Sequence, residues 1–173
     1  RNNCISFKEL SNLKATVFGV GKIGKRIYDM VAGFGMDVRA VDIRAEELSS
    51  LYGNSVRFIS PEEATNSDVI ICAMNYTKDE ASRLYNKGYF TEEYLSRFPD
   101  GLVFINVTRG EIAPEAALLK LYEKGKIFGL GLDAFGGESD LAKILMGISQ
   151  IQLSLAVRIG GDGPGLGAAG LLH

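Results

Sequence analysis

Three glycines and one aspartate have the spacing that anion binding by a helix start requires. Gly19, Gly21 and Gly24 follow an apolar run and open an amphipathic segment, and Asp42 ends the next apolar run, 18 residues after Gly24. Glycines at this spacing allow a tight turn, a close approach of the backbone to a phosphate and close packing of the following helix. The N–H groups and the dipole at the start of that helix attract negative charge. The combination is typical of a dinucleotide-binding turn and is more specific than the glycines alone.

Asp42 predicts which dinucleotide binds. A carboxylate at this position accepts hydrogen bonds from the adenosine ribose and repels a 2′-phosphate, so it favours NAD over NADP. Arg44 follows closely, and because an arginine there could pair with a phosphate, NADP stays open as the alternative. Lys22 lies in the first helical turn, where a cation is unfavourable for an isolated helix. A bound polyanion would relieve that conflict, and a solvated basic face is the other interpretation.

The elements that must position these residues alternate along the chain. Apolar runs that are continuous rather than alternating indicate strands of a parallel sheet covered on both faces. With helical segments between them, they predict an α/β fold, a Rossmann-type doubly wound parallel sheet with helices on both faces. The predicted strands are residues 15–19, 38–42, 56–59, 69–74, 102–107 and 127–133.

Apolar spacing and capping residues predict the helices. The segment after the glycines carries apolar residues at helical spacing, which predict one buried stripe made of Ile23, Ile27, Met30, Val31 and Phe34. A serine, a proline and two glutamates over residues 60–63 are typical of a capped helix start. Another helix is predicted over residues 114–124, because a glycine follows it.

Composition and charge exclude several classes of protein. A net charge of −2 over 173 residues argues against a nucleic-acid partner. No apolar run approaches the roughly 20 residues that span a bilayer, so no membrane partner is expected. Cys4 and Cys72 lie far apart and have no companion ligands at metal-binding spacing, so we expect no metal and no disulfide framework. Two reduced thiols are typical of a cytoplasmic protein.

Two later blocks place charged groups at the carboxyl ends of predicted strands, where ligands of such sheets bind. The first is Asn-Val-Thr-Arg-Gly-Glu at residues 106–111, and the second runs over residues 125–138. Together with the glycine turn, the Ser-Asp-Val-Ile block at residues 67–70 and Ala-Leu at residues 117–118, they occur in a characteristic order. In these motifs the chain, from about residue 10 to Glu138, resembles the NAD-binding domain of the D-isomer-specific 2-hydroxyacid dehydrogenases.

The resemblance implies hydride transfer between NAD(H) and a D-2-hydroxyacid/2-oxoacid pair. Arg109 matches the arginine that binds the substrate carboxylate, and Glu138 matches the acid that hydrogen-bonds the catalytic histidine. Asn75 replaces the usual proline of the adenosine-side loop. The resemblance also implies a homodimer formed through this domain. The cofactor contacts that the turn and the resemblance together imply are Gly19, Gly21, Lys22, Ile23, Gly24, Asp42, Met74, Asn75, Val107, Thr108, Arg109 and Asp133.

The resemblance breaks at the proton shuttle. The reaction needs a general acid/base near neutral pH, and the one histidine of the chain is His173, at its end. At the distance from Glu138 where the family has its catalytic histidine, this chain has Arg158, and an arginine stays protonated and cannot exchange a proton there. The alternative is that the chain departs from the family pattern near residue 145. Two interpretations stay open: a fragment of such a dehydrogenase, or a non-catalytic NAD-sensing or partner-binding module.

The resemblance also divides the chain. Residues 1–9 are expected to be the hinge remnant of a substrate domain that this sequence does not contain, and residues 10–145 to be the NAD-binding domain. Residues 146–173 are rich in glycine and are expected to be a poorly ordered tail.

Overall fold

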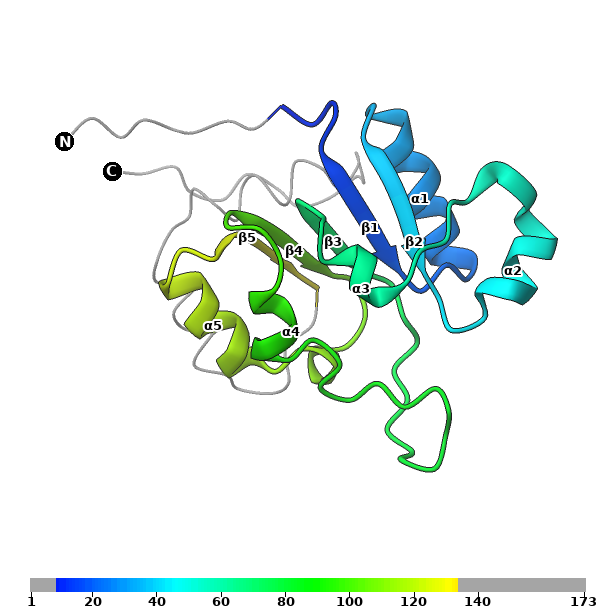
Figure 1. Ribbon diagram of the computed structural model, residues 1–173. Helices are drawn as coiled ribbons and strands as arrows, with labels where there is room; N and C mark the ends of the chain where they lie inside the picture. The colour runs from blue at the N-terminus through cyan, green and yellow to red at the C-terminus, as the bar shows by residue number, and fades with distance from the viewer. Residues whose placement is uncertain (1–8, 134–173) are drawn as a thin grey trace, which may run out of the picture.

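The computed structural model describes residues 9–133, which form a parallel five-stranded sheet in the order β2-β1-β3-β4-β5 (Figure 1). The chain passes from β1 to β2 on one side of β1 and then crosses to β3 on its other side. This reversal creates a switch point at the carboxyl end of β1, where α/β sheets bind ligands. The strands are β1 (Lys14–Phe18), β2 (Asp37–Val41), β3 (Val69–Cys72), β4 (Leu102–Asn106) and β5 (Ile127–Leu132).

Helices cover both faces of the sheet (Figure 1). One core joins α1 to β1, β2 and β3, and the other joins α3, α4 and α5 to β1, β3 and β4. The helices are α1 (Lys22–Gly33), α2 (Ala45–Tyr52), α3 (Pro61–Ala64), α4 (Glu92–Ser96) and α5 (Glu115–Glu123), with 3₁₀ turns at Gly53–Ser55 and Gly110–Ile112.

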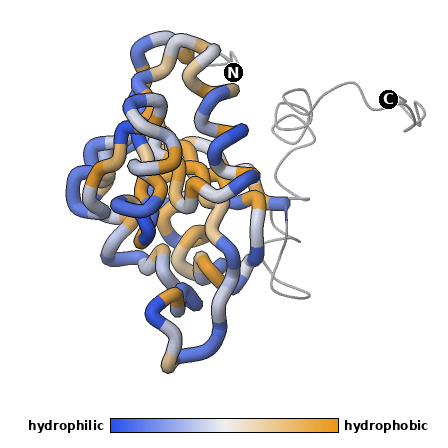
Figure 2. Tube along the Cα trace, turned by 90° about the vertical axis from the view of Figure 1, so that its right-hand side faces the viewer, coloured by the Kyte–Doolittle hydropathy of each residue, from blue (hydrophilic) through white to orange (hydrophobic). Residues whose placement is uncertain are grey.

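Successive residues of the central strands supply different cores. Val17 packs in the core beneath α1, whereas its neighbour Phe18 packs in the opposite core, against the ring of Phe90 at a centroid distance of 5.1 Å. Both side chains are fully buried. A strand buried on both faces must be apolar at every position, and Figure 2 shows the apolar residues gathered in the middle of the molecule. The expected Rossmann-type parallel sheet is therefore confirmed.

Most predicted elements form within one or two residues of their expected ends. The capping box is complete: Ser60 Oγ accepts the Glu63 N–H at 3.1 Å, and the Glu63 carboxylate accepts the Ser60 N–H at 2.9 Å. The predicted strand over residues 56–59 is wrong. Only an isolated bridge between Ala40 and Phe58 forms there, because the segment lies between a 3₁₀ turn and the cap of α3 and is too short to extend the ladder.

The predicted buried stripe of α1 is also wrong in part. Ile23, Met30 and Phe34 are 69%, 53% and 51% exposed. The buried residues of the helix are Gly24, Tyr28 and Val31. Tyr28 was not expected there, and it is accommodated because its hydroxyl donates to the Val38 carbonyl at 2.9 Å and accepts the Arg57 N–H at 3.1 Å. The buried face is consequently rotated toward Tyr28, and one apolar edge of the helix is left uncovered by residues 9–133.

Candidate functional site

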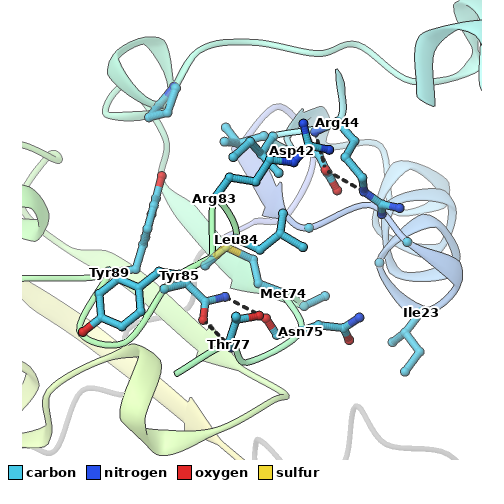
Figure 3. Close-up of a pocket in the computed structure, with 18 of the residues that line it drawn as sticks. Ile23, Asp42, Arg44, Met74, Asn75, Thr77, Arg83, Leu84, Tyr85 and Tyr89 are labelled. Carbon is cyan, nitrogen blue, oxygen red and sulfur yellow. Dashed lines mark hydrogen bonds and ion pairs between the residues drawn. The ribbon is translucent and has the colours of Figure 1, made fainter. Parts of the chain in front are cut away.

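A cavity of about 790 Å³ lies at the carboxyl ends of β1, β2 and β3 (Figure 3). Its walls come from the β1–α1 turn, the end of β2 and the long segment after β3. Figure 3 shows Ile23 on one side of this space and Tyr89 on the other. The predicted cofactor contacts that line it are Gly19, Gly21, Lys22, Ile23, Gly24, Asp42, Met74 and Asn75.

The three glycines of the β1–α1 turn are each required for a different reason. Gly19 has a φ of +84°, and a Cβ there would lie 2.7 Å from the Met74 Cα. At Gly24 a Cβ would lie 1.8 Å from the Gly19 carbonyl oxygen, so the helix can begin this close to the strand only at glycine. A Cβ at Gly21 would meet nothing within 4 Å and would enter open space at the cavity wall. The turn thus fits a dinucleotide, because Gly21 leaves backbone free for a diphosphate at the start of α1.

Asp42 is held in place by the backbone around it. Its carboxylate accepts the Val20 N–H at 2.8 Å and the Arg44 N–H at 2.9 Å. The Arg44 Nε lies 3.6 Å from the same carboxylate, whose side chain is only 7% exposed. The first bond ties the end of β2 to the β1–α1 turn, so the carboxylate and the glycine turn keep a fixed spacing.

The segment after β3 forms the far wall of the cavity without regular structure. Asn86 holds it closed, because its side-chain amide donates to the Asn75 carbonyl at 2.7 Å and accepts the Thr77 N–H at 2.8 Å. This bridge brings Leu84 and Tyr85 to the rim of the cavity (Figure 3). The sequence predicted only the start of this segment, Met74 and Asn75. It did not predict the rest, since a single asparagine between polar and aromatic residues carries no recognisable signal.

The remaining predicted contacts lie at the carboxyl ends of β4 and β5, outside the lining of this cavity. Asn106 organises them: its side chain accepts the Thr108 N–H at 3.0 Å and donates to the Arg109 carbonyl at 2.9 Å. The Asn106 carbonyl accepts the Asp133 N–H at 3.0 Å. Arg109 and Val107 are exposed there. Glu138, Arg158, His173 and Cys4 lie outside the described residues.

Burial raises the pKa of a thiol and of a phenol in this region, both of which are already neutral at pH 7 at their ordinary pKa values. It raises the pKa of the Cys72 thiol, whose sulfur lies 3.6 Å from the Thr108 hydroxyl oxygen. It also raises the pKa of the Tyr89 hydroxyl, and Glu62 adds to that effect. Both groups therefore stay protonated at neutral pH. The charged groups that line the cavity are Lys22, Asp42, Arg44 and Arg83.

Residues 9–133 contain no group of three or more histidine, cysteine, aspartate or glutamate side chains that could hold a metal ion. Over the same residues, no helix combines the length and the apolar character needed to cross a membrane.

Comparisons with known proteins agree with this geometry. The family model described as "D-isomer specific 2-hydroxyacid dehydrogenase, NAD binding domain" matches residues 1–153. The chain belongs to this family. As a 2-hydroxyacid dehydrogenase NAD-binding domain, it is 32% identical over 128 residues to D-3-phosphoglycerate dehydrogenase of Bacillus subtilis, covering 73% of this chain and 23% of that protein.

Other relatives show the same partial coverage. A glyoxylate/hydroxypyruvate reductase of Arabidopsis thaliana is 31% identical over 146 residues, which are 84% of this chain and 42% of the relative. The crystal structure of D-lactate dehydrogenase from Aquifex aeolicus, complexed with NAD and lactic acid, superposes with a TM-score of 0.63 at 30% identity. That match covers 88% of this chain and 44% of the other. This NAD-binding domain therefore spans less than half the length of these relatives.

The contacts of the glycines predict unequal losses of stability for the same substitution at two neighbouring sites. Gly24→Ala forces a methyl group against the Gly19 carbonyl, so we expect it to lower the free energy of unfolding by about 2–3 kcal/mol, as overpacking does. Gly21→Ala places its methyl group in open space at an extended backbone conformation, so it should cost about 1 kcal/mol or less, the loss that alanine causes at an N-cap. Urea denaturation followed by circular dichroism measures both, and equal losses in the two variants would contradict this assignment.

Proposed function

We propose that this chain is the cofactor-binding half of an oxidoreductase that transfers hydride between NAD(H) and a D-2-hydroxyacid/2-oxoacid pair. The observation that carries the proposal is the glycine turn joined to Asp42 by the Val20 N–H, at the edge of one cavity. When bound, NAD supplies or accepts the hydride. The chain itself would bind the cofactor, orient the substrate and exclude water from the cleft.

The cavity is suited to the adenosine half of the cofactor. Its rim carries four large apolar side chains that are otherwise exposed, Ile23, Ile43, Leu84 and Tyr85. A planar apolar ring such as adenine would cover them when bound, which explains why four large apolar side chains are exposed at this rim. Asp42 would then accept the ribose hydroxyls and Gly21 would approach the diphosphate.

The nicotinamide and substrate end would lie at the ends of β4 and β5. We assign Val107, Thr108 and Asp133 to the nicotinamide side, and Arg109 to the substrate carboxylate, which a guanidinium binds through two parallel hydrogen bonds. Arg109 is exposed and its backbone carbonyl is fixed by Asn106. By the same assignment, Glu138 matches the acid that hydrogen-bonds the catalytic histidine of the family, a histidine that this sequence lacks at the expected distance.

NAD binding tests the assignment of Asp42. Asp42→Ala removes the acceptor for the ribose hydroxyls, so we expect the dissociation constant for NAD to rise about tenfold or more in isothermal titration calorimetry. Asp37→Ala, at the other end of β2, removes an exposed carboxylate 3.6 Å from Arg57 and should leave binding unchanged. An unmodified chain that does not bind NAD would refute the proposal.

A second candidate is a non-catalytic NAD-sensing or partner-binding module. The observation that favours it is the arginine at position 158, where the family resemblance implies a histidine. An arginine can bind an oxyanion but cannot donate a proton near neutral pH.

Turnover distinguishes the two candidates. NADH oxidation is measured with a panel of 2-oxoacids for the unmodified chain, for Arg109→Ala and for the matched control Arg97→Ala, at the C-cap of α4. If the chain catalyses the reaction, we expect Arg109→Ala to lower kcat/KM about a hundredfold or more, because the substrate loses its orienting contact. Measurable turnover that Arg109→Ala abolishes would exclude the sensing module.

We also propose that the domain forms a homodimer and that the protein is cytoplasmic. The uncovered edge of α1, with Met30 and Phe34 about half exposed, supports the first. The first turn of α1 holds no acidic residue and the last turn no basic one. Antiparallel packing of two copies of α1 would therefore bring the basic start of each helix to the negative dipole end of the other.

The buried free thiol of Cys72 is compatible with a reducing compartment, which supports the proposed cytoplasmic location.

Sedimentation velocity tests the dimer. Replacing Phe34 by glutamate puts a charge into the proposed contact, so Phe34→Glu should shift the population toward monomer. Leu51→Glu changes an apolar residue on α2 that is 70% exposed and serves as the control. A monomeric unmodified chain, or a dimer that Phe34→Glu leaves intact, would contradict the proposed contact.

A further inference from the structure

The negative charge of the Asp42 carboxylate is partly compensated by other groups of the chain. The Arg44 guanidinium lies 3.6 Å from the carboxylate, and two backbone N–H groups already donate to it. The side chain of Asp42 is 7% exposed, whereas that of Arg44 is 38% exposed. A ligand that reaches this end of the cavity therefore meets more guanidinium than carboxylate.

A second arginine lies across the cavity from Arg44. Arg83 belongs to the irregular segment that Asn86 holds against the site, and Figure 3 shows its side chain directed toward Asp42. Within residues 9–133, Arg83 forms no ion pair with a carboxylate. Two guanidinium groups and one carboxylate thus line the same cavity, and these three side chains together carry a charge of +1.

This charge balance bears on the cofactor that the site accepts. A carboxylate at the end of β2 excludes NADP when its negative charge faces the 2′ position of the adenosine ribose, and an arginine nearby accommodates a 2′-phosphate. In this chain the repelling charge is covered and compensated, while Arg83 is left without a carboxylate partner among the described residues. Guanidinium groups bind phosphate by charge-assisted hydrogen bonds, often in pairs.

We propose that this site accepts a 2′-phosphate as well as a free 2′-hydroxyl, so that the domain binds NADP with an affinity close to its affinity for NAD. Arg83 and Arg44 hold the added phosphate, and Arg83 determines this tolerance. The inference rests on the proposed adenosine site, but it concerns residues that NAD binding itself does not require.

Adenosine nucleotides test this inference without the nicotinamide or the substrate. Titration calorimetry compares 5′-AMP with 2′,5′-ADP, and NAD with NADP, on the unmodified chain and on Arg83→Gln, Arg44→Gln and the control Arg97→Gln. We expect the affinities of the unmodified chain to agree within about tenfold in each pair. Arg83→Gln should weaken the binding of 2′,5′-ADP and NADP about tenfold. It should change the affinities for 5′-AMP and NAD by no more than about twofold. Arg44→Gln should act in the same direction, because it uncovers the Asp42 carboxylate.

Three outcomes would overturn the inference. The first is a dissociation constant for NADP that is more than tenfold above that for NAD. The second is that Arg83→Gln weakens binding of NAD and NADP, or of 5′-AMP and 2′,5′-ADP, by the same factor. The third is an equal effect of Arg97→Gln, which would reflect net charge rather than this site. Failure is distinguishable from failure of the proposed function, since a chain that binds NAD but not NADP refutes only the inference. A chain that binds neither nucleotide refutes both.

Discussion

The close approach of α1 to the end of β1 is the constraint on which the site depends. A methyl group at Gly24 would lie 1.8 Å from the Gly19 carbonyl oxygen, so the helix begins where no other side chain fits. This contact directs the first N–H groups of α1 along the cavity wall. It also sets the position of Val20, whose N–H is bound by Asp42. The turn, the helix start and the carboxylate of β2 are consequently one unit with fixed spacing, which is what binding an extended dinucleotide requires.

The parts of the fold that could be predicted are those set by local patterns. Continuous apolar runs predicted all five strands of the sheet because both faces are buried, and the capping box identified the start of α3. The stripe of α1 was predicted incorrectly, because apolar spacing alone does not show that Tyr28 can be buried when its hydroxyl has two partners. Periodicity identified the amphipathic helix but not which edge of its apolar arc faces the sheet.

The candidate site, like the fold, has a part that could be predicted from the sequence and a part that could not. The glycines and Asp42 could be recognised from spacing, because their roles depend on backbone geometry near one turn. The wall carrying Arg83 and Leu84 could not, because its position depends on Asn86 bonding to Asn75 and Thr77, 11 and 9 residues earlier, across an irregular segment with no periodic pattern. The cofactor side is therefore described by residues 9–133, while the predicted proton-transfer partners lie beyond them.

The most direct test of the central claim is a two-dimensional ¹H–¹⁵N NMR titration of the labelled chain with NAD. The account predicts the largest amide shifts at Gly21, Val20 and Arg44, because the first faces the diphosphate and the other two donate to the carboxylate that binds the ribose. Amides of α4 and α5, on the far side of the sheet, should barely shift. Shifts confined to α4 and α5, or no shifts at saturating NAD, would contradict the account.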